Sequence, residues 1–304
     1  LSPQQEFLKA LRDEIAPSLM RLSGRQVNYE DLYYVARQIG VDYWEYENPA
    51  TEDFVQRIVT ADRFKAISSG ELTNVGRLAN EAWETIRRYV GDVLRQTPPE
   101  AERRCLDLFL ELERDPWPEK IDVFSLNHDV LIEQLWQEHG VEYQDGFMRP
   151  DGQASLWQPS VYETHPKRTS LFKLHGSVDW WYFANYRYNK SMLARVPGQP
   201  NAFHVRNRRG EELPPGEGPA MLIGTFNKML GQAMPGPFLD LLASFWNRLP
   251  RAQYLVILGY GFGDKGINGV LVDWLDWERG RAVWVHPRWE NALDRLARIG
   301  LGLG

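Results

Sequence analysis

The stretch Ile121 to Leu135 reads IDVFSLNHDVLIEQL, and it decides the predicted fold of the chain. Its first five residues are mostly β-branched or aromatic, which is typical of a buried strand. From Val130 onward the apolar residues recur at helical spacing. Between the two patterns lie Asn127, His128 and Asp129. In an open α/β sheet such a polar tip lies at the carboxyl end of a strand, where ligands bind.

Two later stretches repeat this arrangement. LFKLHGSVDWW at 171–181 is an apolar run followed by His175, Gly176 and Ser177. YLVILGYGFGD at 254–264 ends in three glycines within five residues. Because the carboxyl ends of parallel strands meet at one edge of a sheet, we expect the three tips to form one site.

The order of the remaining elements indicates the fold class. Further apolar runs and helical segments lie at 220–224, 282–286, 130–140 and 238–249. Strands that alternate with helices predict an α/β fold with a Rossmann-type, doubly wound parallel sheet over residues 119–304. Proline-, glycine- and arginine-containing stretches near 144–170 and 184–218 are predicted to be loops or small insertions over the site.

Residues 1–118 have the pattern of a helical module that ends at Pro116–Pro118. We expect Pro17 to interrupt the first helix, and Asn28 and Asn74 to cap later ones. The segment holds no histidine. It is therefore interpreted as structure, interface or lid rather than as a source of catalytic groups.

Composition excludes several classes of function. The formal net charge of −6 is not the basic footprint of a protein that binds nucleic acid directly. Cys105 is the one cysteine, so an internal disulfide and a multi-cysteine zinc site are excluded, and a reducing cytoplasm is predicted. No apolar run approaches the roughly 20 residues of a membrane span.

Two motifs have alternative interpretations. LNHD is similar to the Asn-His-Asp of metallophosphoesterases, but the upstream Asp-x-His and downstream Gly-His-x-His that hold two metals are missing. We therefore predict no metal. The tip Asn127–Asp129 is either a set of ligand contacts or a turn with a helix cap. The glycines at 259–263 either admit a phosphate or ribose, or form a simple turn.

The order of four blocks resembles the sirtuin-like domains of bacteria. The blocks are LNHD at 126–129, KLHGS at 173–177, GTFNK at 224–228 and LGYGFGD at 258–264, within a similarity over residues 120–290. The resemblance implies a Rossmann-type sheet with a smaller inserted module, and NAD as the ligand.

The resemblance also implies roles for single residues. His175 would be the catalytic base, Asn127 would hold the nicotinamide ribose or a water, and Asp129 would lie by the nicotinamide pocket. The residues implied to line the adenosine half are Gly259, Gly261 and Asp264. The remaining binding residues expected from the blocks are His128, Gly176, Ser177, Tyr260 and Lys228. Lys173 is interpreted as a packing or edge residue, not as a catalytic one.

The chain also departs from that family pattern. The family's first strand and its Gly-x-Gly loop are expected to precede Leu1. The cysteine pairs of zinc-dependent deacylases are missing, so such an enzyme is disfavoured, and the helical module 1–118 takes the place of the zinc module. Gly261 stands where the family has serine, and Thr225 lacks a preceding proline.

The pattern resembles the NAD-consuming effectors of bacterial anti-phage systems, which act as oligomers or with an Argonaute or a helicase-like ATPase. It implies an NAD+ glycohydrolase (NADase) that cleaves the nicotinamide–ribose bond and releases nicotinamide and linear or cyclic ADP-ribose. An imidazole can accept a proton from a ribose hydroxyl or from water near neutral pH. The alternatives are a sensor that binds NAD or ADP-ribose without turnover, and a structural subunit of an assembly.

Overall fold

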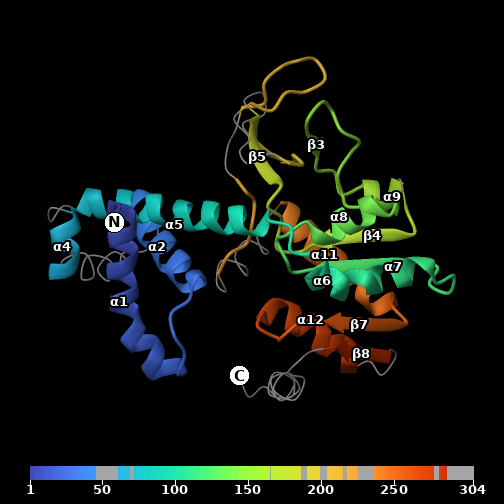
Figure 1. The fold of residues 1–304 in the computed structure, drawn as a ribbon, viewed down its shortest axis with the longest axis horizontal. Helices are drawn as coiled ribbons and strands as arrows, with labels where there is room; N and C mark the ends of the chain where they lie inside the picture. The colour runs from blue at the N-terminus through green and yellow to red at the C-terminus, as the bar shows by residue number, and fades with distance from the viewer. Residues whose placement is uncertain are drawn as a thin grey trace. The chain divides into compact units, whose positions relative to one another are not determined.

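The computed structural model describes residues 1–45, 61–68, 72–164, 166–185, 190–198, 204–214, 218–224, 236–276 and 281–285 (Figure 1). The chain forms two compact units, Leu1–Asn227 and Lys228–Gly304. The first unit contains the N-terminal helical region together with the first parallel strands. The proposed domain boundary near residue 118 stays a prediction.

The helical region comprises α1 (Pro3–Ser23), α2 (Tyr29–Glu45), α4 (Asp62–Ser68) and α5 (Leu72–Leu94). Apolar side chains from all four helices form one core, and its largest fully buried members are Phe7, Leu11, Ile39, Phe64 and Val75. The amphipathic pattern of the sequence therefore correctly predicts helices in this region.

The predicted ends of these helices were partly right. The Oδ1 atom of Asn28 accepts a hydrogen bond from the backbone N–H of Asp31 at 3.0 Å, which confirms the predicted cap of α2. Pro17 lies inside α1 without ending it, because proline removes a single N–H donor and the helix continues to a left-handed cap at Gly24. Asn74 lies within α5, which begins at Leu72, so the predicted cap at Asn74 is wrong.

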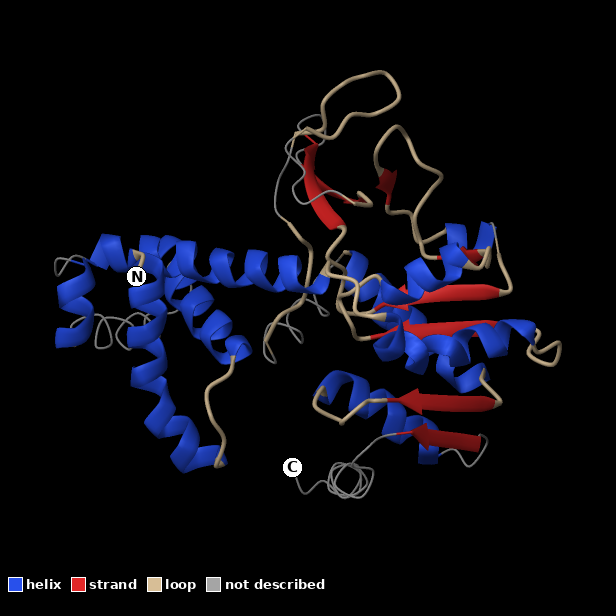
Figure 2. Cartoon of the chain, in the orientation of Figure 1, coloured by secondary structure: helices blue, strands red, loops and turns tan. Residues whose placement is uncertain are grey.

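A short helical segment leads into the first sheet. It consists of α6 (Glu100–Arg103), the 3-10 turn η1 (Arg104–Leu106) and α7 (Asp107–Arg114). The sheet has the order β1 (Ile121–Ser125), β4 (Thr169–Lys173) and β2 (Tyr143–Gln144), and all neighbours are parallel (Figure 2). The helix α8 (Leu131–Glu138) follows β1. The structure thus confirms a mixed α/β fold with a parallel sheet.

The predicted insertions contain regular structure. A second sheet of the first unit is antiparallel, with the order β3 (Ser155–Leu156), β6 (Lys190–Arg195) and β5 (Trp180–Asn185), and the short helix α9 (Val161–Thr164) follows β3. Trp181 and Phe183 are buried in its core.

The apolar run at 220–224 was predicted to be a strand, and that prediction is wrong. It forms an isolated antiparallel bridge between Met221 and Gly176. The N–H of Ser177 donates to the carbonyl of Ala220 at 3.2 Å, and the N–H of Leu222 donates to the carbonyl of His175 at 2.9 Å. The N–H of Ala220 also donates to the carbonyl of Trp180, the first residue of β5, at 2.7 Å, so the run pairs with the turn after β4 and the start of β5 without forming a strand itself.

The second unit contains α11 (Pro237–Arg248), the 3-10 turn η2 (Leu249–Arg251), β7 (Tyr254–Leu258), α12 (Lys265–Asp276) and β8 (Arg281–Val285). β7 and β8 are parallel, with α12 as the crossover between them. Both strands were predicted from the sequence. None of the helices in the described part of the chain is both long and apolar enough to cross a membrane.

Candidate functional site

The turn after β1 carries three of the predicted site residues. Asn127 is exposed, and its backbone N–H donates to the Oγ of Ser125 at 3.1 Å. The Oδ1 atom of Asp129 accepts from the N–H of Leu131, the first residue of α8, at 3.1 Å. A carboxylate at this position also interacts favourably with the helix dipole. Asp129 lies one residue before the N-cap Val130, so its side chain forms the turn into α8, as one interpretation of the sequence expected.

The turn after β4 is buried. His175 is 2% exposed and Ser177 is fully buried. Gly176 has φ 82°, in the left-handed region that favours glycine, and its N–H donates to the carbonyl of Lys173 at 3.0 Å. The glycine of this block is thus required by the shape of the turn.

The structure brings these two turns together. The N–H of Val178 donates to the carbonyl of His128 at 3.0 Å, and the Oγ of Ser177 lies 3.3 Å from the same carbonyl oxygen. The ring centroids of His128 and His175 are 6.2 Å apart. Because β1 and β4 are adjacent and parallel, both turns lie at the carboxyl edge of the sheet.

Charged side chains are buried behind the two turns. Lys173 is 4% exposed, and its Nζ donates to the carbonyl of Asp129 and, at 3.0 Å, to the Oε1 of Glu133. Burial raises the pKa of Glu133, and the attraction of Lys173 opposes this rise. β4 lies between β1 and β2, but β2 pairs only with Thr169 and Ser170. In the described part of the chain Lys173 therefore has a strand partner on the β1 side alone, which agrees with its interpretation as a packing or edge residue.

Asp179 belongs to the same charged group. Burial raises the pKa of its carboxyl group, against the attraction of Lys173 and a hydrogen bond from Ser177. Its Oδ1 atom is buried and has no hydrogen-bond partner among the described residues. The hydroxyl of Ser177 has one proton for two acceptors, and the charged carboxylate is the stronger one.

A residue of the helical region also contacts this group. The Nη2 of Arg95, just after α5, donates to the carbonyl of Val178 at 2.9 Å. Burial lowers the pKa of Arg95, and the nearby carboxylates of Asp92 and Asp179 oppose this effect. A shared apolar cluster includes the side chains of Tyr33, Ile86, Val178, Met221 and Ile223. No local sequence signal indicates the contact, which joins residues 83 positions apart.

The loop after β7 lies in the second unit and is held by its own hydrogen bonds. The Oδ1 of Asp264 accepts from the N–H groups of Gly266 and Ile267 at 2.9 and 3.2 Å, and so caps α12. The hydroxyl of Tyr260 lies 2.7 Å from the Oδ1 of Asn268, and burial raises the pKa of Tyr260.

Glycines keep one side of this loop open. Gly259 has φ 65°, and a Cβ added at Gly259 or at Gly263 would have no atom within 4 Å. Gly261 is partly buried within the loop. Lys228, predicted from the GTFNK block, lies outside the described residues.

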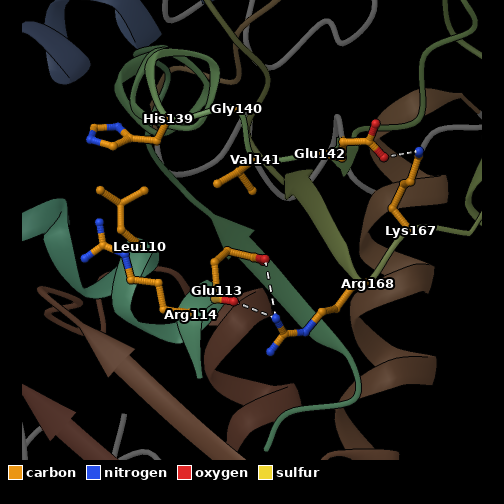
Figure 3. A pocket seen from close by; sticks show the side chains of 9 residues that line it. All are labelled: Leu110, Glu113, Arg114, His139, Gly140, Val141, Glu142, Lys167 and Arg168. Atoms are coloured by element: carbon orange, nitrogen blue, oxygen red, sulfur yellow. Dashed lines mark hydrogen bonds and ion pairs between the residues drawn. The ribbon is translucent and has the colours of Figure 1, made fainter. Parts of the chain in front are cut away.

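A cavity lies elsewhere in the first unit. It has a volume of about 460 Å³, and Figure 3 shows Lys167 pointing at Glu142 and Arg168 pointing at Glu113 across it. Arg168 directly precedes β4 and Glu142 directly precedes β2, so the cavity is at the amino edge of the sheet. Two charged pairs line it, Lys167 with Glu142 at 2.5 Å and Arg168 with Glu113 at 3.7 Å. It does not coincide with the predicted site.

Within the described part of the chain, no three His, Cys, Asp or Glu side chains come together in a way that could hold a metal ion. A family model described as a SIR2-like domain matches residues 122–300, which is more than half of the chain and includes all four sequence blocks. A comparison with curated proteins found no match.

Proposed function

The chain belongs to the SIR2-like domain family, and from that premise we propose that it is an NAD+ glycohydrolase. SIR2-like domains bind NAD, and the hydrolysis of its nicotinamide–ribose bond is the finer step of the proposal. The observation that carries it is the meeting of the Asn127–Asp129 turn and the His175–Ser177 turn at one edge of a parallel sheet.

In the proposed reaction the bond between C1′ of the ribose and the nicotinamide nitrogen breaks. Its electron pair leaves with nicotinamide, which becomes neutral, and the oxygen of a water molecule bonds to C1′. His175 takes the proton of that water. Because His175 is only 2% exposed, part of the wall around it has to move for a ribose to reach the ring.

Asn127 and Asp129 would hold the substrate. The amide of Asn127 is exposed and offers both a donor and an acceptor to a ribose hydroxyl or to the attacking water. A carboxylate has about four acceptor positions, so Asp129 can cap α8 and still accept from the carboxamide of nicotinamide. We assign supporting contacts in this half to His128, Gly176 and Ser177.

We assign the adenosine half to the loop after β7 and to Lys228. The open space at Gly259 and Gly263 supports a close approach of a ligand to the backbone there. The residues proposed to contact this half are Gly259, Tyr260, Gly261, Asp264 and Lys228. A Rossmann-type sheet that carries both halves is part of the proposal.

We further propose a biological setting. The helical module 1–118 would act as a lid or interface in an NAD-depleting anti-phage effector of the cytoplasm. The effector would act as a homo-oligomer or with a helicase-like ATPase or Argonaute partner. The packing of Ile86 of α5 with Val178 and Met221 supports a link between this module and the site.

The test is nicotinamide release from NAD, measured by chromatography. We expect release by the wild type and a loss of at least about 100-fold for His175→Ala, in line with the effect of removing a general base. Asn127→Ala should be similarly impaired. The matched controls are His139→Ala and Asn247→Ala, which change exposed residues and should leave the rate unaltered. Equal rates for His175→Ala and His139→Ala would refute the assignment.

Two observations favour a second candidate, a sensor that binds NAD without turnover. His175 is buried, and the carboxylates of Asp129 and Asp264 are already bonded to backbone N–H groups at the start of α8 and α12. Calorimetric titration with NAD and with ADP-ribose separates the two candidates. Binding without nicotinamide release would favour the sensor, and the absence of binding would refute both.

A further inference from the structure

A lysine is buried between the two turns of the proposed site. Lys173 is the last residue of β4, two positions before His175, and is 4% exposed. A buried ammonium is costly unless it is paired and hydrogen-bonded. Its position between β1, α8 and the turn after β4 therefore calls for a physical explanation.

The ammonium ties the two turns to each other. Its Nζ donates to the backbone carbonyl of Asp129, at the end of the turn after β1. The strand pairing sets Lys173 opposite Ser125, so its side chain crosses from one strand end to the neighbouring turn. One side chain thus fixes the carbonyl of Asp129 relative to His175.

Acidic side chains hold the ammonium in place. The Oε1 of Glu133 lies 3.0 Å from the Nζ of Lys173, and the Glu133 side chain is only 15% exposed. Asp179 lies close enough to Lys173 for the two charges to attract. Arg95 attracts Asp179 from the end of α5. Lys173 and Arg95 therefore share a charged group with the carboxylates of Glu133 and Asp179, and this group is packed against both turns.

We propose that Lys173 is a positioning residue for the nicotinamide–ribose cleavage, an inference that rests on the proposed function. It does not touch the substrate. It holds the turn that carries Asn127 and Asp129 at the distance from His175 that the reaction needs. Misplacement of a reacting group by about 1 Å costs on the order of 100-fold in rate.

The experiment compares kcat and KM for Lys173→Met with those for Lys120→Met, a control at an exposed lysine just before β1. We expect kcat to fall roughly 10- to 100-fold in Lys173→Met with KM within about threefold, because an interaction that matters in the transition state is lost. The control should match the wild type. Lys173→Arg, which keeps a charged donor, should recover part of kcat.

A double variant separates positioning from stability. Lys173→Met alone leaves Glu133 buried without its cation, so the protein could fail to fold. Lys173→Met with Glu133→Gln removes both charges and should fold, but it cannot bind the carbonyl of Asp129. If Lys173 acts by positioning, the double variant should fold and should still have a kcat well below that of the wild type. A folded double variant with wild-type kcat would overturn the inference about Lys173 but not the proposed function.

The wild type in the same assay reports on the proposed function separately. A wild type that releases no nicotinamide would reject the NADase and the inference with it. An active wild type beside a folded Lys173→Met variant of equal kcat would reject only the role of Lys173.

Discussion

Arg95→Met is expected to destabilise the first unit. The Nη2 of Arg95 donates to the carbonyl of Val178 at 2.9 Å, and Val178 is 1% exposed, so methionine would leave a buried acceptor without its donor. Hydrogen bonds to charged groups contribute about 1.5–3 kcal/mol each. The pair of Arg95 with Asp92 adds little, because Asp92 is 68% exposed. We expect a loss of about 2–3 kcal/mol.

The measurement is urea and thermal unfolding of the wild type, Arg95→Met and Arg88→Met. Arg88 is an exposed residue of α5, so the control makes the same chemical change without a buried contact. A loss of 2–3 kcal/mol corresponds to a fall in the melting temperature of roughly 4–12 °C in a cooperative unit of this size. The control should change stability by less than about 0.5 kcal/mol. Equal losses in the two variants would refute the role of the contact with Val178.

Two further predictions concern packing and pH. Gly218→Ala places a Cβ 2.1 Å from the Cε3 of Trp181 and should lower the free energy of unfolding by about 1–3 kcal/mol. Gly269→Ala, in α12, has open space around the added Cβ and should raise the free energy of unfolding, because alanine favours a helix more than glycine does. The measurement is unfolding in urea, and equal shifts in the two variants would contradict the packing argument. A hydrogen bond from Arg25 lowers the pKa of Asp31 in the folded protein. The ionised Asp31 therefore stabilises the fold above its pKa in the unfolded state, about 3.9, and this stabilisation is lost as the pH falls through the lower pKa of the folded state. Asp31→Asn should therefore be less stable than the wild type at pH 7, with a difference that shrinks in melting curves below about pH 4; a difference independent of pH would contradict this.

Local patterns of the sequence predicted a large part of the fold. β1, β4, β7 and β8 were found because short apolar runs rich in β-branched residues favour strands. The residues of the turns after these strands were also found from a local pattern, because polar and glycine residues mark the point where a strand ends. The cap at Asn28 depends on atoms three residues apart, and it was also correct.

Long-range pairing accounts for what the sequence could not predict. Whether β4 is an edge or a central strand depends on its two neighbours, and only the strand order and register show that Lys173, at the end of β4, pairs with β1 and not with β2. The run at 220–224 has the composition of a strand, but its backbone hydrogen bonds join it to His175, Ser177 and Trp180, in and just after the turn that follows β4. Composition alone does not say which segment supplies a partner.

The capping aspartates show why the structural and the ligand-binding interpretation of one residue can both hold. Asp129 and Asp264 each accept from backbone N–H groups at the start of a helix that follows a parallel strand. The same position is where a helix dipole and the end of a strand favour a bound polar ligand. A carboxylate that caps the helix is therefore already held, by its own hydrogen bond, at the edge where a ligand would bind. Capping then fixes the side chain in advance, so that binding needs less ordering of that group.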